Sequence, residues 1–230
     1  MKAKTKIILL AMFAGIIMIL ANFEDTMLML DQNTVYFNSS DITDYEKSAL
    51  VEGELYYPVG CILTVEEPGS FLFIPTGKKK FYYYLVCNIG HDKYDQYMNS
   101  DEEDLNEFYT IFSTSDEALV EKIDSLSNAW SYFNEKYSAG EEADYPVNEI
   151  SFSGKLVEQP DDEEYIEIRD EMLEKWGFAP TEIADYRIAE GRIGALTLIL
   201  SSIGLALFLG GLIALTPVFS GKRKKNEKEG

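Results

Sequence analysis

Residues 193–219 read IGALTLILSSIGLALFLGGLIALTPVF, a run of 27 residues without a charged side chain. A helix rises about 1.5 Å per residue, so about 20 apolar residues cross the hydrocarbon core of a bilayer. Arg192 precedes the run, and the basic cluster GKRKK at 221–225 follows it. A buried helix of this length and apolarity is not expected in a soluble chain of 230 residues. The sequence therefore predicts a transmembrane helix.

A second apolar segment lies near the N-terminus. Residues 7–21 read IILLAMFAGIIMILA, and the segment extends to Phe23. As a helix it reaches about 25 Å, slightly less than a bilayer core, a difference that snorkelling by Lys6 can offset. The alternative is a secretory signal peptide cleaved after Ala21, although Ile19 stands where a small residue is wanted. Either interpretation sends the following segment across the membrane.

The charge distribution predicts the orientation. The chain carries 40 acidic and 20 basic side chains, a net charge of −20, yet residues 1–6 and 221–230 each sum to +3. Basic flanks stay in the cytoplasm. Arg187 and Arg192, on the other side, lie near Asp185 and Glu190. We expect a cytoplasmic N-terminus (1–6), a transmembrane helix or signal peptide (7–23), an extracytoplasmic acidic domain (24–192), a transmembrane helix (193–219) and a basic cytoplasmic tail (220–230).

Such an acidic middle segment excludes one class of function. Residues 7–220 hold 12 basic and 38 acidic side chains, a net charge of −26. Nucleic-acid binding requires a basic face that neutralises phosphates, so no nucleic-acid partner is expected. The charge suits solubility and a weak attraction for cations or basic partners.

Within residues 24–192 the patterns predict an α+β domain. Alternating or β-branched and aromatic runs indicate strands within 48–90 and at 108–113, 149–158 and 183–188. Of these, KFYYYLVCNIG at 80–90 has the strongest strand pattern, and we expect its odd-numbered residues from Phe81 to Ile89 to face inward. LVEGEL at 50–55 and SFSGKL at 151–156 each place Gly two residues before Leu, a position typical of a bulge or a close backbone approach. We therefore expect a curved, mainly antiparallel sheet; a barrel such as that of oligonucleotide/oligosaccharide-binding folds is one form it could take.

Two amphipathic helices complete the expected domain. Thr114-Ser-Asp-Glu117 resembles a capping box, and an apolar stripe with spacings of four and three ends before Gly140. After Pro160 a second helix runs to Trp176 and ends at Gly177. We expect both helices to pack on the sheet.

Small residues recur on one face of the C-terminal apolar helix: Ser202, Ala206, Gly210 and Ala214. This spacing lets a second helix approach closely in a membrane. The N-terminal helix, with Ala11 and Gly15, is one candidate partner, and a homo-oligomer or another membrane protein would use the same face. Gly and Ala are also common in membrane helices without such a role.

Motifs that carry chemistry are missing from the sequence. It holds no GxSxG, P-loop, GxGxxG or CxxC pattern, and its one histidine, His91, is expected in a loop. The acidic clusters at 101–104, 141–144 and 161–164 do not follow the EF-hand pattern. We therefore predict no catalytic residue, no cofactor site and no metal site. Asn38-Ser-Ser40 formally matches a glycosylation acceptor.

The two cysteines permit two interpretations. Cys61 and Cys87 lie on apolar faces of adjacent expected strands. Outside the cytoplasm they could form a disulfide, worth about 3 kcal/mol, if their Cα atoms lie within about 7 Å. Otherwise they are small buried hydrophobic residues.

The whole layout resembles uncharacterised small double-pass membrane proteins of Gram-positive bacteria. The resemblance rests on the MKAKTK start, the KFYYYLV and SGKL strands, the KWGF helix end and the final apolar helix followed by GKRKK. It implies no activity. We expect a membrane-anchored extracytoplasmic binding or interaction module, as an accessory or sensory partner of another membrane protein or as a homo-oligomer. The alternatives are a membrane-bound hydrolase that uses acidic residues and a structural cell-envelope protein.

Overall fold

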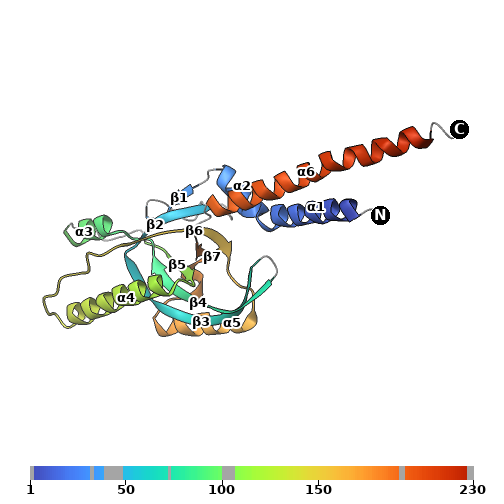
Figure 1. The fold of residues 1–230 in the computed structure, drawn as a ribbon. Coiled ribbons are helices and arrows are strands. Elements are labelled where there is room, and N and C mark those ends of the chain that lie inside the picture. Colours follow the sequence, from blue (N-terminus) through green and yellow to red (C-terminus); the bar gives the residue numbers. More distant parts are fainter. Residues whose placement is uncertain are drawn as a thin grey trace. The chain divides into compact units, whose positions relative to one another are not determined.

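The computed structural model describes residues 3–31, 34–38, 49–71, 74–99, 107–191 and 195–226. The chain divides into two compact units, one formed by Met1–Asp31 with Ile193–Gly230 and the other by Gln32–Arg192. Figure 1 shows the first as helices and the second as a sheet with helices. Residues 24–31, which the sequence places in the outer domain, thus group with the helical unit.

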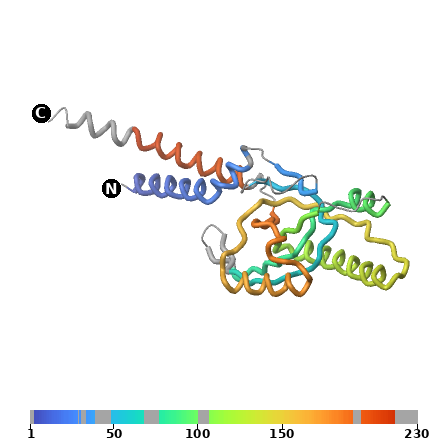
Figure 2. The backbone as a smooth tube through the Cα atoms, turned by 180° about the vertical axis from the view of Figure 1, so that it is seen from behind, coloured from blue at the N-terminus to red at the C-terminus, as the bar shows by residue number. Residues whose placement is uncertain are grey.

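Three helices form the helical unit: α1 (Ala3–Ala21), α2 (Phe23–Asp31) and α6 (Ala195–Asn226). Helices α1 and α6 lie side by side and antiparallel, so the start of α1 and the end of α6 share one end of the pair (Figures 1 and 2). Both are long and apolar enough to cross a membrane, and only 11% and 17% of the residues in their spans are buried. Core helices of soluble proteins bury far more of their apolar surface, so this exposure suits a lipid environment.

Glycine allows the two helices to approach closely. A Cβ atom built on Gly15 would lie 2.5 Å from the carbonyl oxygen of Gly204. Three residues before Gly204, the side-chain oxygen of Ser201 lies 2.8 Å from that of Thr26 on α2, within hydrogen-bond distance. Small side chains and hydroxyl contacts are the features that pack helices in lipid, where the hydrophobic effect does not drive helices to associate.

The second unit is α+β and contains a mixed sheet of seven strands. Its order is β1-β2-β6-β7-β5-β4-β3, with β1–β2 and β5–β7 parallel and the other neighbours antiparallel. The strands are β1 (Thr34–Tyr36), β2 (Leu50–Leu55), β3 (Tyr57–Phe71), β4 (Ile74–Cys87), β5 (Tyr109–Thr114), β6 (Ile150–Glu158) and β7 (Ile183–Glu190). The sheet is open, with β1 and β3 at its edges, so the structure does not support the barrel form of the prediction.

A sharp bend at Tyr56 curves the sheet. Only this residue separates β2 from β3, although the two strands pair with different neighbours, β6 and β4, and lie far apart in the strand order. The indole Nε1–H of Trp130 donates a hydrogen bond to the Tyr56 carbonyl oxygen at 2.6 Å, and Ser127 Oγ donates to the Val59 carbonyl at 3.0 Å. These bonds satisfy backbone groups that the bend would otherwise leave unpaired.

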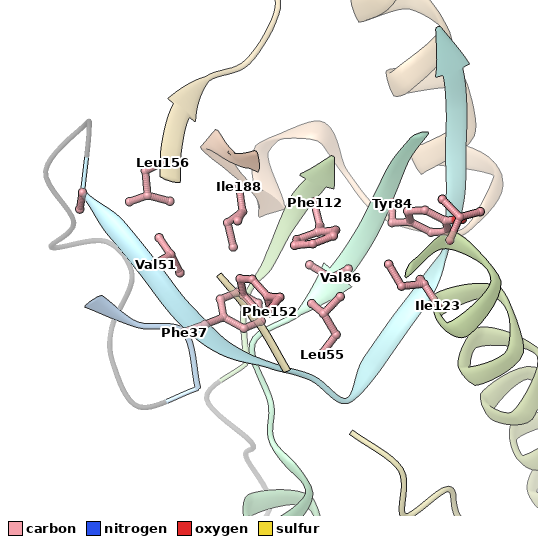
Figure 3. Packing of buried hydrophobic residues seen from close by; sticks show 12 residues of the cluster. Phe37, Val51, Leu55, Tyr84, Val86, Phe112, Ile123, Phe152, Leu156 and Ile188 are labelled. Atoms are coloured by element: carbon pink, nitrogen blue, oxygen red, sulfur yellow. The ribbon is translucent and has the colours of Figure 1, made fainter. Parts of the chain in front are cut away.

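The curvature encloses one hydrophobic core between the strands. Figure 3 shows Leu55, Val86, Phe112 and Phe152 converging from four strands, with Ile123 reaching them from a helix. A second buried cluster, which includes Tyr83 and Leu85, lies on the opposite face of β4 and is packed against Tyr165 and Leu173. The prediction of a single inward face for 81–89 is therefore wrong, since residues 83–89 are buried on both faces.

Three helices and a short 3-10 turn, η2 (Pro180–Glu182), accompany the sheet. They are α3 (His91–Asn99), α4 (Glu117–Ser138) and α5 (Glu163–Lys175). The predicted helices correspond to α4 and α5, whose ends are followed by Gly140 and Gly177 at φ +71° and +85°. The cap of α4 is Asp116, whose carboxylate accepts the backbone N–H of Ala118 at 2.9 Å, not the predicted Thr114. Strand β1 and helix α3 are not anticipated by the sequence patterns.

The two matching glycines mark close backbone approaches, one of the two predicted interpretations. A Cβ on Gly154 would lie 2.5 Å from the Ala189 carbonyl oxygen, and one on Gly53 would lie 2.6 Å from Cβ of Phe37. The pairing of β2 with β6 has no register shift, so neither glycine forms a bulge there. Both glycines therefore let neighbouring chain segments pack without a gap.

Candidate functional site

A pair of carboxyl groups meets where β2 ends and β6 begins. Glu54 belongs to β2, and Glu149 immediately precedes β6; their neighbours Leu55 and Ile150 pair across the two strands. Burial raises the pKa of Glu54 above its ordinary value, and the charge of Glu149, a hydrogen bond to it and the charge of Asp92 raise it further. The nearby negative charge disfavours the ionised form of Glu54, so this carboxyl group keeps its proton to a higher pH than an ordinary glutamate does.

Hydrogen bonds that involve backbone groups hold this pair in position. The backbone N–H of His91, at the start of α3, donates to Glu149 Oε1 at 2.7 Å. Asn38 binds the backbone of Glu54 in both directions, donating from Nδ2 to its carbonyl at 2.9 Å and accepting its N–H at 2.8 Å. A second bond from Asn38 Nδ2 reaches the Asn88 carbonyl at 3.2 Å. A glycan on this nitrogen would disrupt the bonds, which argues against glycosylation at Asn38; residues 39–40 of that motif lie outside the described residues.

A groove of about 670 Å³ lies next to Glu149. Helix α4 forms one wall and the start of β6 with the two residues before it the other; the lining residues are Glu121, Lys122, Ser125, Leu126, Ala129, Asn148, Glu149, Ile150 and Ser151. The volume falls in the range of small-ligand sites, and six of the nine lining residues have polar or charged side chains, more than is usual for such sites. The groove is therefore a candidate binding site for a polar ligand or a short polar segment of a partner.

A second groove, of about 510 Å³, lies between the start of β5 and the segment that follows α5. Glu107 Oε1 accepts the hydroxyl of Tyr109 at 2.9 Å, and its Oε2 lies 4.0 Å from the Cys87 sulfur. Burial, followed by the charge of Glu107, raises the pKa of the Cys87 thiol well above its ordinary value. This thiol stays protonated at neutral pH and is no nucleophile.

The cysteines are both free, so the disulfide interpretation is not realised in this structure. Cys61 lies opposite Tyr84, whereas Cys87 lies opposite Tyr57. Four residues of extended strand separate Cys61 from Tyr57, about 13 Å along β3, which exceeds the distance that a disulfide spans. The two cysteines thus fit the other interpretation, since Cys87 is buried and Cys61 half-buried.

His91 begins α3, which corrects the predicted loop. Its ring contacts Tyr56 edge-to-face at 5.4 Å, and Nδ1 lies 3.8 Å from an Asp92 carboxylate oxygen. Across the described residues, no group of three or more histidine, cysteine and carboxylate side chains could hold a metal ion. The acidic cluster at 101–104 lies outside the described residues.

The small-residue face of α6 does not contact α1. Ser202, Ala206, Gly210 and Ala214 are all exposed, and no atom lies within 4 Å of a Cβ built on Gly210. Helix α1 packs instead on the opposite side of α6, where Gly204, Gly211 and Leu215 are buried. The prediction that α1 packs on this small-residue face is therefore wrong. That a second chain packs on the face stays a prediction. Gly15, named from the sequence, does lie at the contact.

Sequence reasoning did not identify the Glu54–Glu149 pair. The two residues lie on strands that are distant in the chain, and the alternation in LVEGEL is the only local sign that Glu54 shares a face with other polar residues. Searches against protein-family models, curated proteins and solved structures returned no match. The groove and the carboxyl pair must therefore be interpreted from their own geometry.

Proposed function

We propose that this chain is a membrane-anchored interaction module with two transmembrane helices, both termini in the cytoplasm and the acidic α+β unit outside. The observation that carries the proposal is the antiparallel pair of α1 and α6, whose apolar side chains are largely exposed. The antiparallel arrangement brings Lys4, Lys6 and the basic stretch after 221 to one end of the pair. A common basic end is what the positive-inside rule requires of two short cytoplasmic flanks.

The groove beside α4 supports a binding role for the outer unit. One wall is a helix of 22 residues that buries Ile123 and Trp130 in the core, so it presents its outer residues on a rigid element. A partner segment laid in this groove would meet Lys122 and Ser125 from α4 and Glu149 from the opposite wall, which offer both charges and a hydroxyl. This arrangement suits a polar segment of another membrane protein, for which the chain would be an accessory or sensory subunit.

We propose, as a finer description of the fold, that β2–β7 form a partly open five-stranded barrel. Residues 50–71 would act as one strand bent at Tyr56, with its first half paired to β6 and its second half to β4. Each strand of this set then has a neighbour on both sides, except at the bend. The parallel pairing of β5 with β7 and the position of α4 between β5 and β6 in the chain support the barrel arrangement. Barrels of this type bind ligands on one face and in their loops.

A membrane-bound hydrolase is the second candidate, and Glu54 with Glu149 is the observation that favours it. A carboxyl group with a raised pKa, as Glu54 has, can serve as a general acid while a neighbouring carboxyl group serves as a base. Glu149 lines the groove, so a bound substrate would reach it. Glu149→Gln separates the two proposals: it should abolish hydrolysis in the enzyme interpretation and leave partner binding within a few-fold in the module interpretation.

Crosslinking in native membranes tests the module proposal. After ultracentrifugation without detergent the full chain should be in the pellet; recovery in the supernatant would contradict membrane anchoring. Ala129→Trp fills the groove from an exposed position on α4 and should abolish the crosslinked partner band, whereas Asn128→Trp, exposed on the same helix outside the groove, should retain it. Equal bands for both variants would exclude the groove as the interaction site.

A further inference from the structure

The first part of β6 has a free edge beside α4. Strand β6 pairs with β2 along its stretch from Ile150 to Lys155. On the other side, its pairing with β7 begins only at Gly154. Among the described residues, no strand lies next to 150–152 on that side. An edge of this kind presents unpaired backbone N–H and C=O groups, with which a further strand can pair.

The hydrogen bonds of β6 show which of its residues turn their backbone groups to this edge. In an antiparallel sheet, the N–H and C=O of one residue point to the same neighbouring strand, and those of the next residue point to the opposite one. The N–H of Leu156 donates to the carbonyl of Ala49, on the β2 side, at 2.9 Å. The carbonyl of Ser153, on the other side, accepts the N–H of Gly191 at 3.2 Å. Ser151, two residues before Ser153, therefore presents both groups to the free edge.

The corresponding groups of β2 are already satisfied. Glu54 lies opposite Ser151, and its N–H and C=O point away from β6. The side chain of Asn38 accepts this N–H at 2.8 Å and donates to this C=O at 2.9 Å. No hydrogen bond among the described residues does the same for Ser151. The strand pair thus has one closed edge and one open edge, and Ser151 lines the groove of about 670 Å³.

Acidic side chains surround the outer face of this edge. Ser151 and Glu149 share that face, because Ile150 between them packs against the core. Glu54 lies on the same face, opposite Ser151. Burial and the charges of Glu149 and Asp92 raise its pKa above the ordinary value. A residue paired with Ser151 in a new strand would place its side chain on this face, where the charge favours lysine or arginine.

The wall formed by α4 is nearly neutral by comparison. Glu121 and Lys122 carry opposite charges there, and Leu126 and Ala129 are apolar. In a new strand, the residues between the basic ones would point to the inner face, where Ile150 packs with Leu126. Small side chains fit at this wall, because Ala129 contributes only a methyl group to it. The groove therefore matches a segment that alternates basic and small residues.

We propose that an extended segment of a partner protein, with lysine or arginine at every second position, pairs its main chain with Ser151 and adds a strand to β6. The inference rests on the proposed function, which makes this groove the interaction site, and it specifies the conformation and the charge of the bound segment. In this mode of recognition, main-chain hydrogen bonds supply affinity and alternate side chains supply specificity.

A labelled peptide tests the proposal on the full chain in phosphatidylcholine nanodiscs. The probe consists of three Lys-Thr repeats with an N-terminal fluorescein, and fluorescence anisotropy measures its dissociation constant. Ser151→Pro removes the edge N–H and no bond to β2, a position at which strands tolerate proline. This substitution should weaken binding about tenfold, since a main-chain hydrogen bond is lost and its acceptor stays unpaired. Ser151→Ala keeps the N–H, so it is the matched control and should bind within about twofold of the parent chain.

Methylation of the peptide gives a second measurement, which holds even if Ser151→Pro fails to fold by circular dichroism. N-methyl groups on the lysine residues remove the donors that would face Ser151 and keep every charge. The methylated peptide should bind the parent chain about tenfold more weakly than the unmethylated one. Equal affinities for the two peptides would overturn the proposal, because the acidic surface would then attract the lysines without an added strand. No binding of the unmethylated peptide would overturn it as well.

Crosslinking in native membranes separates this failure from failure of the proposed function. Strand addition predicts that Ser151→Pro, like Ala129→Trp, removes the partner band and that Ser151→Ala retains it. A band that Ala129→Trp removes and Ser151→Pro retains would keep the groove as the interaction site and overturn the added strand. Absence of the band from the parent chain would contradict the interaction module itself, and the inference with it.

Discussion

At the scale of single residues, the raised pKa of Glu54 should make the stability depend on pH. An acid whose pKa is higher in the folded than in the unfolded chain binds its proton more tightly when folded. The contribution of Glu54 to the free energy of unfolding is therefore fully present below its ordinary pKa of 4.5, and it is lost as the pH rises through the folded-state value. Glu54→Gln keeps a neutral hydrogen-bonding group at every pH and should remove this decline.

We expect Glu54→Gln to match the parent chain at pH 4 and to be more stable at pH 7. The gain should be less than about 1 kcal/mol, because the pair is partly solvated. Urea unfolding of the detergent-solubilised chain, followed by near-UV circular dichroism at the two pH values, measures it. Glu52→Gln, exposed on the same strand, is the control and should keep the pH dependence of the parent. An identical pH dependence in both variants would show that Glu54 titrates as an ordinary surface carboxylate.

Trp130 is the residue on which the bend at Tyr56 depends most. It is 2% exposed, its ring contacts Tyr56 and Tyr57 edge-to-face at 5.1 and 4.6 Å, and it donates to the Tyr56 carbonyl. Trp130→Phe leaves that carbonyl without a donor and leaves a void, so we expect a loss of about 2–4 kcal/mol in the free energy of unfolding.

The control for this prediction lies on the same helix. Tyr132 is 61% exposed, and Tyr132→Phe should change the stability by less than about 0.5 kcal/mol. Thermal and urea unfolding of the two variants should therefore differ clearly. A Trp130→Phe variant as stable as Tyr132→Phe would mean that the bend does not rely on the indole hydrogen bond.

At the scale of elements, the contact of α1 with α6 depends on its glycines. Gly15→Leu would drive a side chain into the backbone at Gly204, which should weaken the pair by about 1–2 kcal/mol. The readout is disulfide formation between Thr26→Cys, on the helix α2 that directly follows α1, and Ser201→Cys on α6, whose parent oxygens lie 2.8 Å apart. We expect the crosslinking rate in nanodiscs to fall about five- to thirtyfold.

Gly210→Leu is the matched control for the helix pair. Nothing lies within 4 Å of its Cβ position, so crosslinking between residues 26 and 201 should proceed at the parent rate. The same variant reports on the exposed face of Ser202, Ala206, Gly210 and Ala214. If a second chain uses that face, the larger side chain should dissociate an oligomer that the parent forms in detergent.

At the scale of the whole molecule, the sequence predicts what depends on near neighbours. The stripe from Ile123 to Phe133 and the glycines at 140 and 177 define α4 and α5 because helix periodicity and left-handed ends are local properties. The apolar runs of α1 and α6 are equally local. Long-range pairing is not: β1 has three residues and exists through its parallel register with β2, and α3 has a weak apolar pattern and packs on aromatic residues from distant elements.

Strand register, which the sequence patterns do not predict, determines how far apart the cysteines lie and which carboxyl groups meet. The cysteines lie on adjacent strands as expected, but the β3–β4 register separates them. Glu54 and Glu149 come together only because β2 and β6 pair with Leu55 opposite Ile150. A shift of one residue in the β2–β6 register would turn Glu54 to the other face of the sheet and separate its carboxyl group from that of Glu149. The candidate site is thus a property of strand pairing, which propensity and composition do not determine.

The orientation of the chain in the membrane gives the prediction with the widest consequence. The proposed topology has both antiparallel helices α1 and α6 crossing the bilayer, so it predicts Lys4 and the basic stretch after 221 on one side and the acidic unit on the other. Cysteine placed at Ser138 should react with a membrane-impermeant maleimide in intact cells, and cysteine placed at Lys4 only after permeabilisation, both in a Cys61→Ser background. The reverse pattern would place the groove and the carboxyl pair in the cytosol, and the partner would have to be sought there. Labelling at both positions in intact cells would contradict the two-span arrangement, since Lys4 and Ser138 lie on opposite sides of the membrane if α1 crosses it.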